Sequence, residues 1–100
     1  METAFKLGVE LARVKYDVLR RQGIFVIVNG LKTIVELLKG LNLDLAVANE
    51  INEWIKYLNE NYSPGDSIEK EDGNALVRDI ERWRNLIEEA LRKGELAKET

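Results

Sequence analysis

The segment Ile24–Leu41, with the sequence IFVIVNGLKTIVELLKGL, is the most apolar part of the chain and constrains its fold most. Its apolar residues recur at intervals of three and four, which is the spacing of a helix packed along a partner. A helix that is apolar around most of its circumference is normally buried on several sides. We therefore expect a central helix that also has apolar surface available for a second copy of the chain or another protein. The main stripe is Ile24, Val28, Leu31, Val35 and Leu38, and Ile27, Ile34, Leu37 and Leu41 lie beside it.

A second interpretation of this segment is a β-hairpin. Ile24 to Val28 is a run of strand-forming residues, and Asn29-Gly30 directly after it is a strong hairpin signal. However, the residues that follow lack the alternation of a strand, and the helical spacing continues through the Asn-Gly pair. The pattern favours a helix, with an α+β fold as the alternative.

The remainder of the chain carries three more apolar stripes at helical spacing. We expect one domain over residues 1–100, an all-α up-down bundle with helices at about 3–21, 24–40, 44–61 and 73–93. Because the central helix has more apolar surface than its neighbours would cover, we also expect dimerisation. The expected N-caps are Thr3, Asp72, and either Asn42 or Asp44, and the expected helix-ending glycines are Gly23, Gly40 and Gly94.

The chain contains no cysteine and no histidine. Disulfides, thiolate or imidazole metal sites, cysteine nucleophiles and histidine bases are therefore excluded. The N-terminal sequence does not resemble a signal peptide, and charged residues interrupt the apolar segment before it reaches the length of a membrane span. We expect a cytoplasmic protein of a prokaryote that needs no cofactor and does not bind a membrane.

Charge is unevenly distributed along the chain. Residues 1–43 contain seven basic and four acidic residues, net +3, whereas residues 44–72 contain two basic and eight acidic residues, net −6. Such complementary blocks orient packing within a chain or between chains.

Four acidic residues form the weak candidate metal site: Glu50, Glu53, Glu69 and Asp72. Each pair has a spacing of three, and oxygen ligands of this kind suit Mg²⁺. The pattern resembles the all-α nucleotide pyrophosphohydrolases, which place paired acidic residues on two helices of a bundle. That resemblance implies a Mg²⁺-dependent nucleotide hydrolase. The chain departs from the family pattern at Asn49, where a third carboxylate is expected, and a chain this rich in glutamate also produces such spacings by chance.

Five arginines form a candidate nucleic-acid surface: Arg13, Arg20, Arg21, Arg78 and Arg82. Arginines of this kind bind phosphates. The chain is acidic overall, however, with a net charge of −3, whereas nucleic-acid-binding domains usually show a basic excess. Pairing with neighbouring carboxylates is the alternative.

Exposed aromatic residues are typical anchors of protein interfaces. Trp54 and Tyr57 are three residues apart and off the main stripe of their helix, so they are either exposed together or covered by the bundle. The candidate interface consists of Ile24, Phe25, Ile27, Val28, Leu31, Trp54 and Tyr57.

The leading functional hypothesis is a non-catalytic interaction module: an adaptor, regulator or structural subunit that acts as a homodimer or with a protein partner. An accessory subunit of a nucleic-acid-handling complex and a Mg²⁺-dependent hydrolase are the alternatives. The missing catalytic residue types favour the first.

Overall fold

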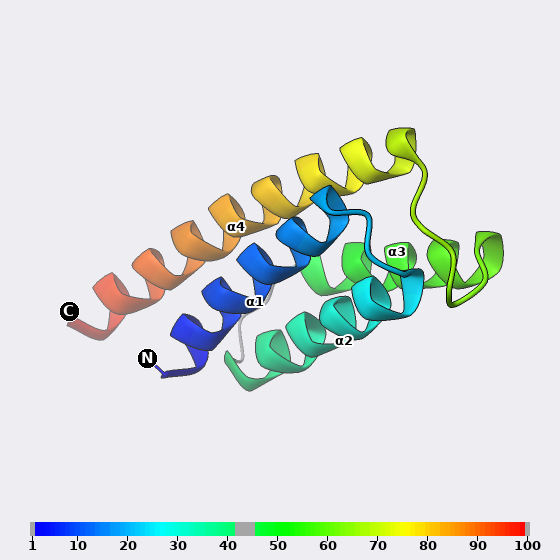
Figure 1. The fold of residues 1–100 in the computed structure, drawn as a ribbon. Coiled ribbons are helices and arrows are strands. Elements are labelled where there is room, and N and C mark those ends of the chain that lie inside the picture. Colours follow the sequence, from blue (N-terminus) through cyan, green and yellow to red (C-terminus); the bar gives the residue numbers. More distant parts are fainter. Residues whose placement is uncertain (1, 42–45, 100) are drawn as a thin grey trace.

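The computed structural model of the chain describes the backbone of residues 2–41 and 46–99, and side chains as far as residue 93. Over these residues it contains α1 (Glu2–Leu19), α2 (Ile24–Leu41), α3 (Val47–Asn61) and α4 (Lys70–Glu99), with no strand (Figure 1). The all-helical class is thus confirmed. The hairpin alternative is wrong, because Asn29 and Gly30 lie inside α2.

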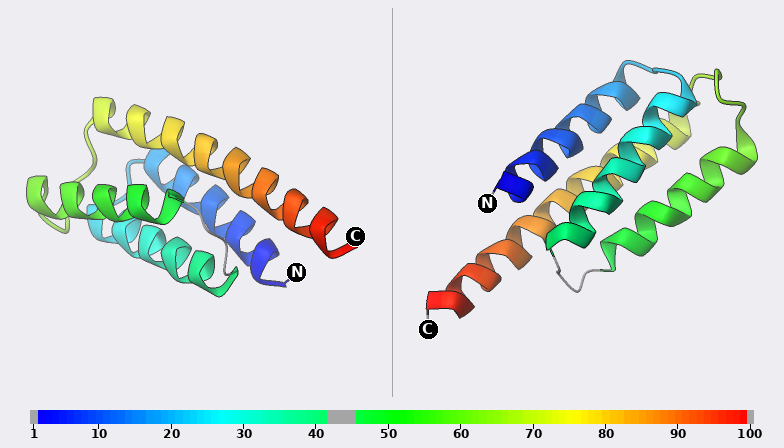
Figure 2. Two further views of the ribbon diagram at one scale, coloured as in Figure 1. Left: turned by 180° about the vertical axis from the view of Figure 1, so that it is seen from behind. Right: turned by 90° about the horizontal axis from the view of Figure 1, so that it is seen from below.

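The two N-terminal helices, α1 and α2, each pack against two other helices. α1 packs against α2, α2 also packs against α3, and α1 also packs against α4 (Figure 1). The molecule measures 49 × 20 × 20 Å. Its long dimension reflects α4, which has 30 residues and, at 1.5 Å per residue, spans about 45 Å. Figure 2 shows that α4 extends past the N-terminal end of α1.

The core is built from residues at helical spacing on all four helices. α2 contributes more buried residues than either α1 or α3, as the apolar pattern predicts. Trp83 of α4 is completely buried, and Ile68, in the connection before α4, is also part of the core. The buried residues of α2 are Ile24, Ile27, Val28, Leu31, Ile34, Val35 and Leu38.

The α1–α2 connection is paired with the α3–α4 connection. Gly23 forms an isolated antiparallel bridge with Ser67, and the N–H of Ile24 donates to the carbonyl of Asp66 at 2.8 Å. The N–H of Phe25 donates to the carbonyl of Pro64 at 2.9 Å. The first N–H groups of a helix need such partners, so the carbonyls of one connection replace a side-chain N-cap for α2.

Several expected helix ends are wrong. α1 ends at Leu19, and the left-handed residue after it is Arg21, with φ of 55°, rather than Gly23, which is engaged in the bridge. Gly40 and Gly94 lie within α2 and α4, at a cost of about 1 kcal/mol each relative to alanine. Thr3 lies within α1. Asp72 lies in the first turn of α4, where its carboxylate accepts hydrogen bonds from Tyr57 of α3 and from Tyr62, the residue directly after α3. Asn42 and Asp44 fall outside the described residues.

Within the part of the chain that the structure describes, no helix is both long enough and apolar enough to cross a membrane.

Candidate interaction surface

Four of the seven exposed large apolar residues of the described chain form a second stripe on α1. Phe5 is 73% exposed, Val9 51%, and Tyr16 and Leu19 58% each. With the exposed Ala12 they recur at intervals of four, three, four and three, so they share one face of the helix. We call these five residues the α1 outer stripe. The face of α1 that packs into the core carries Leu7, Leu11, Val14 and Val18.

The α1 outer stripe is continuous, which distinguishes it from scattered surface hydrophobic residues. Single exposed apolar side chains are normal, but contiguous patches of a few hundred Å² on monomers mark interaction sites. Gly8 lies next to the stripe, and an added Cβ there would meet no atom within 4 Å. A partner can therefore approach the backbone of α1 closely at this position.

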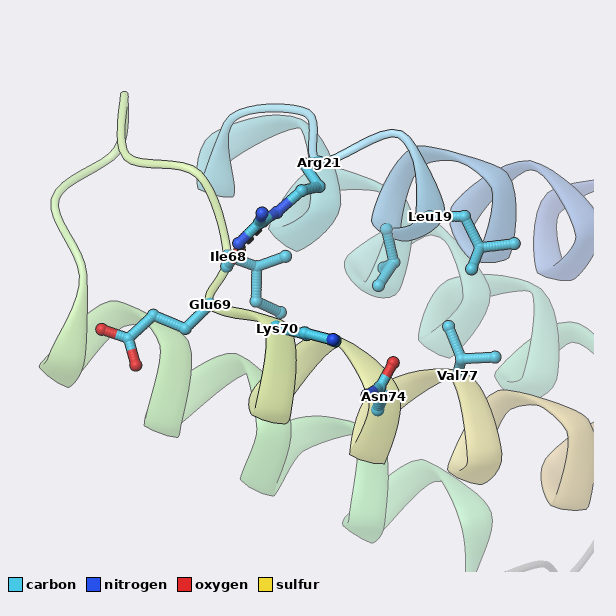
Figure 3. Close-up of a pocket in the computed structure, with 9 residues that line it drawn as sticks. Leu19, Arg21, Ile68, Glu69, Lys70, Asn74 and Val77 are labelled. Atoms are coloured by element: carbon cyan, nitrogen blue, oxygen red, sulfur yellow. Dashed lines mark hydrogen bonds between the residues drawn. The ribbon is translucent and has the colours of Figure 1, made fainter.

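A groove between α1 and α4 runs beside the α1 outer stripe. One cavity of about 300 Å³ lies between Tyr16 and Leu19 on α1 and Ile80 on α4. A second cavity of about 250 Å³ lies nearer the N-terminal end of α4, between Leu19 and Val77 (Figure 3). Leu19 lines both cavities, and we refer to the two together as the α1–α4 groove.

The residues expected at an interface on α2 are mostly inaccessible. Ile24, Ile27, Val28 and Leu31 are at most 4% exposed, so contacts within one chain already cover them. Phe25 alone among the α2 candidates is exposed, at 55%. Most of the exposed large apolar side chains in the described part of the chain are therefore on α1 rather than on the central helix.

Trp54 and Tyr57 lie together, as expected, in an edge-to-face arrangement with ring centroids 5.7 Å apart. Trp54 is half-buried, and its indole N–H donates to Asp79 Oδ2 of α4 at 2.8 Å. Tyr57 is 42% exposed, and its hydroxyl is within 3.1 Å of both carboxylate oxygens of Asp72. Both residues thus connect α3 to α4, and neither projects freely into solvent.

Tyr62 completes this connection between α3 and α4. Its hydroxyl donates to Asp72 Oδ2 at 2.6 Å and accepts from the backbone N–H of Glu69 at 3.0 Å. Burial, together with the Asp72 carboxylate, raises the pKa of Tyr62 to about 12. The hydrogen bond to Asp72 also raises the pKa of Tyr57. Both hydroxyls are therefore structural donors that keep their protons to higher pH than an ordinary tyrosine does.

The five candidate arginines do not form one surface. Arg82 is held between Glu50 and Asp79 on the α3 side of α4, where its Nη2 donates to Asp79 Oδ1 at 3.0 Å. Arg21 donates to the carbonyl of Ile68 at 3.1 Å in the α1–α4 groove. Arg20 lies over the Tyr16 ring, 5.1 Å from its centroid. The others are exposed: Arg13 lies 3.7 Å from Glu10, and Arg78 is on α4.

Of the four acidic candidates, Glu53 and Asp72 line one cavity together with Trp54 and Tyr57, whereas Glu50 is held by other partners. Glu50 accepts hydrogen bonds from Arg82 and, at 3.4 Å, from the indole N–H of Trp83. The Arg82 contact is the main reason that the pKa of Glu50 lies below its ordinary value. Asp72 is bound by two tyrosines, whereas Glu53 and Glu69 are exposed. Among the residues that the structure describes, no three acidic side chains are placed to hold a metal ion.

No protein-family model, curated protein or solved structure matches this chain.

Proposed function

We propose that this chain, a small up-down helical bundle, is a non-catalytic interaction module of the prokaryotic cytoplasm that acts as a homodimer or within a larger complex. The observation that carries the proposal is the α1 outer stripe. Four large apolar side chains on one face of one helix are each more than half exposed. Covering them removes apolar area from water, which favours association by about 25 cal/mol per Å² before the costs of binding are deducted.

The side-chain chemistry supports the same proposal. The sequence has no histidine or cysteine, so the commonest general base and the commonest thiol nucleophile are missing. The acidic and basic residues considered as catalytic or phosphate-binding groups are partly committed to contacts between α3 and α4, as with Glu50 and Arg82. The hydrolase and nucleic-acid alternatives therefore have no observation comparable to the exposed stripe.

The test compares the native chain with the double variant Val9→Asp/Tyr16→Asp. Both positions are more than half exposed, so the variant should retain its helical circular dichroism. Light scattering after size exclusion measures self-association, and affinity capture from the native cell followed by co-purification measures a complex with another protein. We expect one of the two assemblies in the native chain and neither in the variant. A native chain that is monomeric and retains the same proteins as the variant would contradict the proposal.

A matched control changes the same amount of charge elsewhere. Asn52→Asp/Asn59→Asp adds two carboxylates on exposed positions of α3, a helix that packs mainly against α2 and not against the α1 outer stripe. This control should assemble like the native chain. Equal loss in the control and in the stripe variant would attribute the effect to added negative charge rather than to the apolar surface.

A further inference from the structure

The charged residues that border the α1 outer stripe are predominantly basic. Lys6, Arg13 and Arg20 each follow a stripe residue directly in sequence, so they lie along one border of it. Lys15 lies on the other border and lines the α1–α4 groove. In a helix pair these are the positions whose charges select the partner.

The carboxylates near these bases form weak and replaceable pairs. Lys6 lies 3.6 Å from Glu2 and Arg13 lies 3.7 Å from Glu10, and both basic side chains are more than 60% exposed. Exposed pairs of this kind contribute little to stability, so a partner's carboxylate can substitute for them. Lys15 has the closest such contact, 2.6 Å to Glu81 on α4. Arg20 lies over the ring of Tyr16, and within the described residues its guanidinium pairs with no carboxylate.

A second copy of this chain does not fit the same surface through its own α1. In an antiparallel pair of α1 helices, Lys6, Arg13 and Arg20 would face the same three residues of the other copy. In a parallel pair they would face the border that carries Gly8 and Lys15. The carboxylates on these borders are Glu2 and Glu81, and they already pair with Lys6 and Lys15. Neither arrangement therefore adds carboxylates for the facing bases, and like charges across an interface disfavour the complex. The outer stripe therefore calls for a partner of opposite charge.

The end of the α1–α4 groove next to the N-terminus of α4 is basic as well. Arg21 and Lys70 line the cavity at this end together with Asn74. Figure 3 shows Lys70 and Asn74 at the rim of this cavity, and it shows the carboxylate of Glu69, which also lines the cavity, directed away from Asn74. Arg21 is held in place by its two hydrogen bonds to the carbonyl of Ile68. The basic border thus continues beyond the end of the outer stripe.

We propose that the α1 outer stripe and the α1–α4 groove bind one amphipathic helix of a partner protein, whose apolar face is bordered by aspartate and glutamate. The inference rests on the proposed function and specifies the partner's chemistry. A helix laid in a groove uses apolar anchors at helical spacing, which match the spacing of the stripe. The acidic borders of the partner meet the bases on both sides of the stripe.

The experiment selects peptides on the intact chain. A display library of helical peptides about three heptads long carries a fixed leucine stripe, and its border positions are randomised among acidic, basic and neutral residues. Selection on the native chain is paired with counter-selection on Val9→Asp/Tyr16→Asp. We expect aspartate and glutamate to be enriched at the border positions. Individual peptides should bind at least about tenfold more weakly to Arg13→Glu/Arg20→Glu, and the difference should shrink at high salt.

The control for charge is Lys32→Glu/Lys56→Glu, which reverses the same number of charges at exposed positions of α2 and α3. It should bind the selected peptides like the native chain. Basic or neutral borders, or equal loss in both reversal variants, would overturn the inference. A selection that enriches no peptide would also overturn the inference. Light scattering would then show whether the chain self-associates, in which case the proposed function still holds. Vesicles of phosphatidylcholine and phosphatidylserine are tested in parallel, and stripe-dependent binding to them without peptide enrichment would replace the partner helix by a lipid surface.

Discussion

Gly30 of α2 lies directly against the side chain of Val14 of α1: a Cβ added at Gly30 would come within 3 Å of Val14 Cγ2. Real Cβ atoms essentially never approach a neighbour so closely, so the missing side chain is what allows the two helices to meet here. Valine is branched at Cβ and stiff about χ1, so it cannot easily turn aside. The Asn29-Gly30 pair, which signals a turn in the sequence, is therefore a helix-packing feature.

Gly30→Ala should destabilise the fold. The added methyl group overpacks the α1–α2 contact at a cost of about 1–3 kcal/mol, and the better helix propensity of alanine returns about 1 kcal/mol. We expect a net loss of about 1 kcal/mol in the free energy of unfolding. Urea denaturation followed by circular dichroism measures it, with an unchanged m-value.

Gly8→Ala is the matched control, because Gly8 is also inside a helix but has open space around it. This change should stabilise the fold by about 0.5–1 kcal/mol. In a Val14→Ala background, Gly30→Ala should lose its destabilising effect, since the clashing methyl group is gone. An undiminished effect in that background would show that the Gly30–Val14 contact is not the cause.

The helical class was predictable from the sequence because apolar spacing reports which residues share a helix face. Ile24–Leu41 illustrates this: the expected helix began at Ile24, where α2 begins, and its main stripe is buried. On α1 the same rule was ambiguous. Two apolar stripes at identical spacing lie on that helix, one through Leu7 and one through Phe5, and periodicity alone does not say which faces the core.

The spacing of apolar residues does not predict contacts between segments that are distant in the sequence. Glu50 and Arg82 are 32 residues apart, and their pairing depends on how α3 and α4 are aligned. The predicted start of α4 was wrong for a similar reason. Asp72 was expected to cap the helix, but tyrosine hydroxyls from outside α4 bind its carboxylate, and the helix begins at Lys70.

Trp54→Phe isolates the hydrogen bond between α3 and α4. Phenylalanine retains an aromatic ring but removes the N–H that donates to Asp79 at 2.8 Å. We expect a loss of about 1 kcal/mol in the free energy of unfolding, the usual net value of such a bond. In an Asp79→Asn background, the same substitution should cost less, because the charged acceptor is already gone. Equal costs in both backgrounds would assign the loss to the smaller ring instead.

Glu50 should make stability depend on acid pH. The hydrogen bonds from Arg82 lower the pKa of the Glu50 carboxyl from its ordinary value of 4.5, so the unfolded chain takes up this proton at higher pH than the folded chain. The contribution is present above pH 4.5 and is lost as the pH falls through the lowered pKa. Because both side chains are more than a third exposed, it amounts to at most about 1 kcal/mol.

Glu50→Gln should reduce the loss of stability between neutral pH and acid, as measured by urea denaturation at a series of pH values. Glu53→Gln removes an exposed carboxylate one turn along the same helix and serves as the control. Its acid dependence should match that of the native chain. Identical pH profiles for Glu50→Gln and the native chain would rule out the Arg82 contact as a source of stability.

Tyr62 should make stability depend on alkaline pH in the opposite sense. Its pKa is raised to about 12 because its hydroxyl is partly buried and donates to Asp72, so the unfolded chain loses this proton first, near pH 10. The contribution is therefore fully present below pH 10 and is lost as the pH rises toward 12. Tyr62→Phe should lower stability at neutral pH by about 1 kcal/mol, the usual net value of a hydrogen bond, and should weaken the alkaline decline.

Ultraviolet titration of the folded chain separates this residue from the other tyrosines. Tyrosinate absorbance should show a component that appears only near pH 12, and Tyr62→Phe should remove it. The hydroxyl of Tyr57 also binds Asp72 but is exposed, so Tyr57→Phe should leave this latest component in place. If Tyr57→Phe removes this component and Tyr62→Phe does not, the hydroxyl of Tyr62 is not the one that binds Asp72 most strongly. The link between Tyr62 and the first turn of α4 would then be weaker than the 2.6 Å contact implies.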